Sequence, residues 1–244
     1  MAAEDGAVRS VTRALDLLGH FTEQRMVWPV AELARVSGLP KTTVVRLVAT
    51  LSSTGMLWER PDGQVTVGAG LMRWARLARA AWELPFEVRA VLEALAASSR
   101  ETVNLYVRQG FARVCVAQAE GPQTLRHVVR IGDEMPLWAG AASKILLGDA
   151  PADVVDAMVE RAGEGLREQI AEAAAEKFAV SHGERESGAS GVAAPVVDKK
   201  GRVVAALALG GPTTRFTEDR VPLFRTALAD AAAEVSRLGL PAVV

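Results

Sequence analysis

The sequence predicts an α+β fold that begins with a winged helix-turn-helix domain, continues through a linker helix and ends in an α/β domain. Three observations predict it. Three short amphipathic segments lead into a hairpin, an arginine-rich helical segment follows, and helical and alternating segments then interleave to the end of the chain. We expect domain boundaries of 1–68, 69–84 and 85–244.

Composition restricts the class of protein. The 244 residues are 50% hydrophobic and 23% charged, which is typical of a globular chain. No apolar run approaches the roughly 20 residues of a membrane span, and the N-terminus lacks a basic and apolar leader, so we expect a cytoplasmic protein without a membrane partner. A lone cysteine, Cys115, excludes a disulfide framework. Residues 1–80 carry 10 basic and 7 acidic side chains, which permits nucleic-acid binding.

The first two helices are predicted from apolar spacing. One runs from Val8 to Phe21, and a second starts near Pro29, where proline at a first helical position costs nothing. Ser37-Gly38 then breaks the second helix with a turn. The inward residues are Val8, Val11, Ala14, Leu15, Leu18 and Phe21 in the first helix, and Val30, Leu33 and Ala34 in the second.

A third helix beginning at Pro40-Lys41 has two distinct faces. Its apolar stripe is Val44, Leu47, Val48 and Leu51, at i, i+3, i+4 and i+7. Its other face carries Lys41, Thr42, Thr43, Val45 and Arg46. Cations, hydroxyls and one methyl-bearing side chain are the mixture that reads base edges and phosphates in the major groove.

A hairpin follows the third helix. Residues 57–60 and 64–67 alternate around Pro61-Asp62-Gly63, and Asp-Gly between alternating runs is a strong hairpin signal. Arg60 at its tip is placed to touch a phosphate. Three helices and a hairpin predict a winged helix-turn-helix that binds double-stranded DNA; the alternative is a structural three-helix unit without DNA.

The segment from Leu71 to Trp82 is helical in pattern, with Leu71, Trp74 and Leu77 on one side. It is either a solvated helix joining two domains or the seam of a dimer. A two-fold dimer is expected for helix-turn-helix proteins, because it matches two half-sites roughly 34 Å apart.

The second domain combines helices with strands joined by turns, which predicts an antiparallel or mixed sheet covered by helices. Small residues cluster at strand ends and at a helix start, where they would leave a cavity and expose N–H donors for a carboxylate. The alternative is close backbone packing. The predicted helices cover 86–99, the end of 136–147, 153–169 and 218–238; the predicted strands cover 102–107, 113–117, 124–131, 191–197 and 203–209, and another begins at 178.

The chain resembles the IclR family of bacterial transcriptional regulators over nearly its whole length. The front carries Ala31-Glu32-Leu33-Ala34 and Gly38-Leu39-Pro40-Lys41-Thr42-Thr43. The second half carries Arg130-Ile131-Gly132, Ala142-Ser143-Lys144 and Ala193-Ala194-Pro195-Val196 in family order. Other short segments, among them Gly183-Glu184-Arg185-Glu186, resemble those of an actinobacterial subgroup of the family that is linked to amino-acid metabolism.

This resemblance implies a GAF-like effector domain with a mostly antiparallel sheet, and homodimers or dimers of dimers on palindromic operators. It places DNA contacts on Lys41, Thr42, Thr43, Val45, Arg46 and Arg60. It places the small-molecule pocket on Leu125, Val128, Ala141, Ala142, Ser181, Ala189, Gly191, Ala208 and Gly210. Because Ala208, Gly210 and Ser181 replace polar groups of some members, we expect an emptier, more apolar pocket for a branched or aromatic acid or an amino acid.

Two alternatives to a ligand-responsive regulator remain. The second domain could serve oligomerisation only, or the chain could be an enzyme on a GAF-like scaffold. Cys115 fits a core position, and Ser143-Lys144 fits a capped or exposed helix start better than a catalytic pair. The histidines and Cys115 lack the spacing of a zinc site, so we expect neither metal nor cofactor. Trp138 adjoins the pocket loop and could stack on a ligand.

Overall fold

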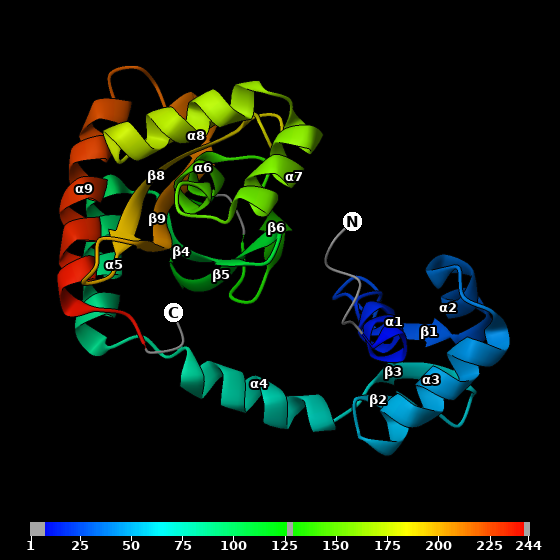
Figure 1. Ribbon diagram of the computed structural model, residues 1–244. Helices are drawn as coiled ribbons and strands as arrows, with labels where there is room; N and C mark the ends of the chain where they lie inside the picture. The colour runs from blue at the N-terminus through cyan, green and yellow to red at the C-terminus, as the bar shows by residue number, and fades with distance from the viewer. Residues whose placement is uncertain (1–7, 126–128, 242–244) are drawn as a thin grey trace. The chain divides into compact units, whose positions relative to one another are not determined.

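The computed structural model describes residues 8–125 and 129–241. It divides into two compact units, Met1–Ala81 and Trp82–Val244 (Figure 1). The α+β fold class is confirmed, with the helix-turn-helix elements in the first unit and an antiparallel sheet in the second. Within the described residues, no helix has the length and hydropathy to cross a bilayer.

The first unit is a winged helix-turn-helix. Within the described residues, its strands form a three-stranded antiparallel sheet in the order β1-β3-β2. Its elements are α1 (Arg9–Leu18), β1 (Val27–Pro29), α2 (Val30–Ser37), α3 (Lys41–Ser53), β2 (Leu57–Glu59), β3 (Gln64–Val67) and α4 (Gly70–Ala81). The sequence missed β1, and Pro29 belongs to that strand, so α2 begins one residue later than expected.

The core of the first unit corrects the predicted inner face of α1. Leu17 is fully buried, whereas Val8, Val11 and Leu15 are more than half exposed. The helix carries apolar residues on two sides, and spacing alone cannot say which side packs. The buried residues of this core are Leu17, Trp28, Leu33, Val44, Val48, Leu51, Leu57 and Val65.

The second unit is built on an antiparallel sheet in the order β6-β5-β4-β9-β8-β7. Every pairing between these strands is antiparallel, so the predicted mostly antiparallel sheet is confirmed for the described residues. The strands are β4 (Thr102–Gln109), β5 (Ala112–Ala119), β6 (Glu134–Pro136), β7 (Ala179–His182), β8 (Ala189–Val197) and β9 (Val203–Pro212). The helices are α5 (Phe86–Ser99), α6 (Ala141–Leu147), α7 (Ala152–Ala162), α8 (Gly165–Glu176) and α9 (Val221–Leu238).

Helices cover both faces of this sheet (Figure 1). Helices α5 and α9 pack on one face, against a cluster that includes Val192, Leu207 and Leu209. Helix α6 packs on the other face, where the strands present Ala193 and other small residues. Because successive strand residues point to opposite faces, β8 and β9 give one face large side chains and the other small ones.

Two predicted elements of this unit are wrong. No strand covers the described parts of 124–131; Leu125 and Ile131 are 70% and 67% exposed. A turn forms there instead, with Gly132 at φ +94° and the Arg130 backbone N–H donating to Asp133. The single helical region expected over 153–169 is two helices, α7 and α8, separated at Gly163 with φ +98°.

A bidentate ion pair fixes the start of the sheet to the segment before α9. The Arg215 guanidinium donates to both oxygens of Glu101, at 2.6 and 2.7 Å. Glu101 is 1% exposed, so its charge depends on this partner.

We expect Glu101→Gln to destabilise the second unit by about 3 kcal/mol, because it removes half of a desolvated charge pair. The matched change Glu176→Gln breaks an exposed pair with Arg225, and we expect it to cost under about 1 kcal/mol. Urea unfolding followed by circular dichroism measures both. Equal losses in the two variants would show that burial of Glu101 does not set the strength of its pair.

Candidate nucleic-acid interface and ligand pocket

Helix α3 presents a polar face that its buried stripe holds in place. Val44, Val48 and Leu51 are buried, and the turn before the helix uses Gly38 at φ +67°, where a side chain would be strained. The predicted DNA-reading residues Lys41, Thr42, Val45 and Arg46 are exposed, and Thr43 is half-buried. Within the described residues, neither Lys41 nor Arg46 forms an ion pair, so both cations are available to a partner.

The wing places Arg60 beside the turn of its hairpin. Its backbone N–H donates to Gln64, and Gly63 turns the chain at φ +74°. The guanidinium lies 3.2 Å from Asp62 and remains 45% exposed, so a phosphate can still reach it. Trp58 on β2 is 61% exposed, a feature that the alternating pattern did not single out.

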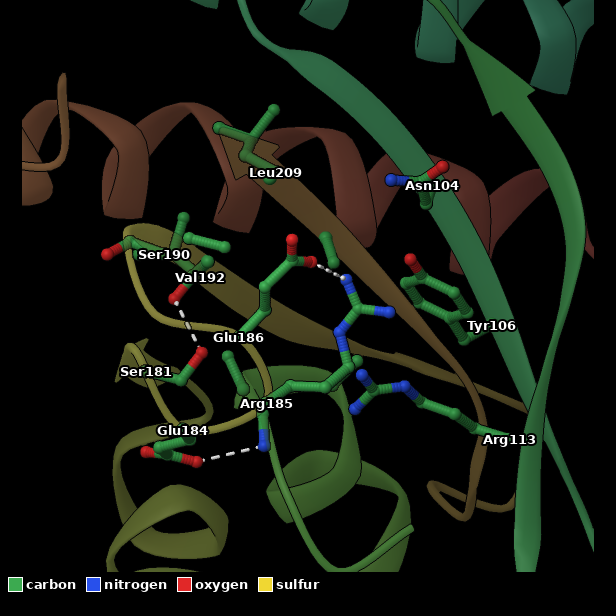
Figure 2. Close-up of a pocket in the computed structure, with 17 residues that line it drawn as sticks. Asn104, Tyr106, Arg113, Ser181, Glu184, Arg185, Glu186, Ser190, Val192 and Leu209 are labelled. Atoms are coloured by element: carbon green, nitrogen blue, oxygen red, sulfur yellow. Dashed lines mark hydrogen bonds and ion pairs between the residues drawn. The ribbon is translucent and has the colours of Figure 1, made fainter. Parts of the chain in front are cut away.

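A pocket opens in the second unit between β4, β5, β8, β9, α6 and the loop after β7 (Figure 2). Seven of the nine predicted effector residues line it: Ala141, Ala142, Ser181, Ala189, Gly191, Ala208 and Gly210. Leu125 lies exposed and outside the lining, and Val128 falls outside the described residues. The register pairs Gly191 with Gly210, so two neighbouring strands leave out side chains at the same level.

The pocket is charged, which corrects the expectation of an apolar site. The sequence analysis did not assign these polar lining residues to the pocket, although the segment Gly183-Glu184-Arg185-Glu186 stood out in it as a similarity to a subgroup of the family. These residues are Asn104, Tyr106, Arg113, Glu184, Arg185, Glu186 and Ser190. The free space among them is about 60 Å³.

Arg113 is a buried cation of this pocket. It is 6% exposed, and its terminal nitrogen Nη1 donates to the carbonyl oxygen of Ala139 at 2.7 Å and to the hydroxyl of Ser143. Its Nε is buried without a hydrogen-bond partner. Burial lowers the pKa of this guanidinium from its usual value. Figure 2 shows Arg113 pointing from β5 toward the stem of Arg185.

The start of α6 is already occupied by a carboxylate of the chain. Glu184 accepts a hydrogen bond from the Gly140 backbone at 2.9 Å, and its other oxygen lies 2.6 Å from Lys144 Nζ. Lys144 is 6% exposed and also donates to Val180. The Gly140 N–H is therefore not free for a ligand, and the expectation of an exposed Lys144 is wrong.

Among the residues with described positions, the nucleophile and base candidates do not assemble into a catalytic site; His127 falls outside those residues. Cys115 is fully buried, as expected of a core residue. Ser190 bridges His182 and Thr213 at 2.8 Å each, which is a hydrogen-bond chain without an acidic third member. Among the residues that the structure describes, no three His, Cys, Asp or Glu side chains gather as metal ligands.

Trp138 does not face this pocket. It lines a separate hollow of about 360 Å³ with Phe111 and Met158, and the Arg161 guanidinium lies 5.5 Å from its ring centre. Stacking of Trp138 on a ligand of the main pocket is thus ruled out by its position.

A winged helix-turn-helix with an exposed polar face, in a chain whose second unit contains a charged pocket, is the architecture of a transcriptional regulator. Comparison with known proteins gives the same class. Residues 10–61 match the IclR helix-turn-helix domain, and residues 82–237 match the family described as bacterial transcriptional regulator IclR C-terminal. The chain belongs to the IclR family and is a regulator rather than an enzyme.

Relatives cover the whole architecture. The HTH-type transcriptional regulator KipR of Bacillus subtilis is 28% identical over 94% of this chain and 96% of its own. The crystal structure of an IclR-family protein from Rhodococcus sp. is 46% identical, covers 99% of this chain and 97% of its own, and has a TM-score of 0.65. An IclR homologue from Microbacterium hydrocarbonoxydans, solved with 4-hydroxybenzoate, shares the fold at 21% identity and a TM-score of 0.73, over 94% and 100% of the two chains.

We expect Cys115 to be unreactive in the folded protein. Burial raises the pKa of its thiol to about 12, so at pH 8 only about 1 in 10⁴ molecules carries the thiolate that attacks a disulfide reagent. Labelling with a chromogenic disulfide should be slow in buffer and fast in urea. Rapid labelling in buffer would show that this strand opens readily.

Proposed function

We propose that the protein controls transcription in the cytoplasm by binding palindromic operators as a homodimer or dimer of dimers. Its affinity for the operator changes when a small acid or amino acid binds to the second unit. The observation that carries the DNA part is the exposed face of α3. Val44 and Val48 fix that face, and the cations Lys41 and Arg46 stand on it without internal partners among the described residues. Such a face supplies both phosphate and base contacts.

Exposed apolar side chains support the dimer. Trp74 and Leu77 of α4 are 52% and 42% exposed, and no residue of this helix is buried. Val11 and Leu15 of α1 are also exposed. Apolar surface on two helices of a DNA-binding unit is typical of a subunit interface, and a two-fold pair of units matches a palindrome.

The effector part rests on the pocket and on one relative. Arg113 and the small residues around it provide a cation beside free space, and the Microbacterium homologue is described as complexed with 4-hydroxybenzoate, an acid. One observation favours the competing function, in which the second unit only assembles subunits: the chain's own Arg185 and Glu186 leave only about 60 Å³ of free space. Titrating a gel shift with aromatic, branched and amino acids separates the two, because an assembly domain gives no change in operator affinity for any acid.

We expect Arg46→Ala to weaken binding to the operator, found first by footprinting bound genomic DNA, by about 1–3 kcal/mol. The side chain is exposed, so the fold should be unaffected. Fluorescence anisotropy with an operator duplex measures the loss. The control is Arg89→Ala, which removes an exposed arginine of α5; equal affinity in Arg46→Ala and Arg89→Ala would contradict the placement of the reading helix.

We expect Leu77→Asp to raise the dimer dissociation constant at least about tenfold, since it puts a charge into an apolar contact. Light scattering after size-exclusion chromatography measures this. Ala75→Asp adds the same charge to the other side of α4, where Ala75 is also exposed, and should leave the dimer intact. If the Leu77→Asp variant remains a dimer, the subunit interface does not include this side of α4.

A further inference from the structure

The exposed face of α3 combines cations and hydroxyls with one large apolar side chain, that of Val45. We propose that Val45 binds the 5-methyl group of a thymine in each half-site of the operator, so that this position of the helix selects a T·A pair. This role rests on the proposed function, in which α3 binds an operator, and adds to it a base type and the chemical group that is recognised.

Packing inside the chain does not account for Val45. Its side chain is 48% exposed, whereas those of Val44 and Val48 are 0% and 2% exposed. Within the described residues, it belongs to none of the hydrophobic clusters. A β-branched residue also lowers helix propensity, so neither packing nor local structure favours valine here. Single exposed valines are common on protein surfaces, and the surroundings of Val45 therefore decide its role.

Val45 lies in the middle of the face that carries the cations. Lys41 stands one turn before it and Ala49 one turn after it, and residues four apart lie on the same side of a helix. All three are exposed. Arg46 follows Val45 directly, and within the described part of the chain neither Lys41 nor Arg46 forms an ion pair. DNA that contacts Lys41 and Arg46 therefore also covers Val45.

The charge of this face identifies its partner as an anion. Residues 41–53 contain Lys41 and Arg46 and no acidic side chain. A second copy of the same face would repel it, and an uncharged apolar partner would cover both cations without supplying a counter-ion. Double-stranded DNA offers both kinds of group on one surface, since phosphates flank the methyl groups of the major groove.

Hydroxyl groups divide the face into two parts. Toward the C-terminal end of α3, Thr50 Oγ1 donates to the carbonyl oxygen of Arg46 at 2.9 Å, and Ser53 Oγ donates to that of Thr50 at 2.8 Å. A hydroxyl has one proton to donate, so neither offers it to a base. The hydroxyl of Thr42 makes no hydrogen bond to another described residue. Free hydroxyl donors thus precede Val45, and the face becomes apolar at Val45 itself.

The chemistry of the bases then selects thymine. Among the four bases, only thymine presents an apolar methyl group in the major groove. The other bases present hydrogen-bond donors and acceptors there. A valine side chain forms no hydrogen bond, so it would displace water from those groups without replacing the lost hydrogen bonds. Val45 therefore favours thymine through contact and disfavours the other bases through desolvation.

The full-length protein and its operator test this role. The operator is found by footprinting, and each of its thymines is replaced singly by deoxyuridine, which removes the 5-methyl group and keeps the pairing with adenine. Fluorescence anisotropy at one fixed salt concentration measures the affinity for each duplex. We expect uracil at one thymine of a half-site to weaken wild-type binding about fourfold, the value for burial of one methyl-sized group. The same change in both half-sites should weaken it about sixteenfold.

The variant Val45→Ala distinguishes a direct contact from an effect of the missing methyl group on the shape of the duplex, which proteins read indirectly. The position is exposed and alanine favours a helix, so this variant should fold. We expect the uracil that weakens wild-type binding about fourfold to weaken binding of Val45→Ala less than twofold. The control Val36→Ala makes the same change at an exposed position of α2 and should keep the fourfold loss.

Two results overturn this role of Val45. One is a loss below twofold at every thymine in the wild-type protein. The other is a loss of twofold or more that persists in Val45→Ala at the sensitive thymine. Both leave the proposed function intact, because the protein still binds its operator. Failure of the proposed function is a different observation, in which no duplex is bound with sequence preference, whether or not its methyl groups are present.

Discussion

The second unit depends on a difference in side-chain size between the two faces of β8 and β9. Val192, Leu207 and Leu209 face α5 and α9, where they build a dense apolar layer. Ala193 and Ala206 face α6, and Gly191 and Gly210 pair at the end of the same strands. Helix α6 packs against the two alanines, and the pocket lies farther along the strands, where Ala189, Gly191, Ala208 and Gly210 line it with almost no side chain. The cavity is the space left over, and the polar groups of β4, β5 and the loop after β7 converge on it.

Gly140 links three of the elements around that cavity. Its backbone N–H binds Glu184 of the loop after β7. A Cβ on it would lie 2.9 Å from Nη1 of Arg113, and its φ of +96° disfavours any side chain. The chain therefore needs glycine here for two reasons, conformation and space. Through this residue the positions of α6, the loop and the buried guanidinium on β5 become interdependent.

The sequence predicts the local features of this protein better than the contacts between residues that lie far apart in the chain. The stripe of α3 fixes which side of that helix is buried, so its polar face follows directly. For the first helix the same reasoning succeeds only in part: Ala14, Leu18 and Phe21 pack against the core, but the fully buried Leu17 lies outside the periodic set. The run from Thr124 to Ile131 alternates like a strand, yet its described residues form no strand: Leu125 and Ile131 are exposed, and the chain turns at Gly132.

The pocket shows the same division. Its small residues could be predicted, since glycines and alanines at strand ends are visible in one sequence. Arg113 and Lys144 could not, because their partners lie 30 and 40 residues away along the chain. Tertiary contacts decide whether a charged side chain is buried. From the sequence alone, an arginine in an alternating strand is therefore predicted to face the solvent.

Three consecutive residues of the loop after β7, Glu184, Arg185 and Glu186, line the pocket and differ in their exposure. Glu184 has two short hydrogen-bonded contacts and a partner lysine that is 8% exposed, so removing it would strand a buried cation. Arg185 and Glu186 meet at 3.5 Å with the carboxylate mostly in solvent, a contact worth about 0–1 kcal/mol. Glu186 can therefore change its position at little cost, whereas Glu184 cannot, because its removal would leave the buried Lys144 without its carboxylate partner.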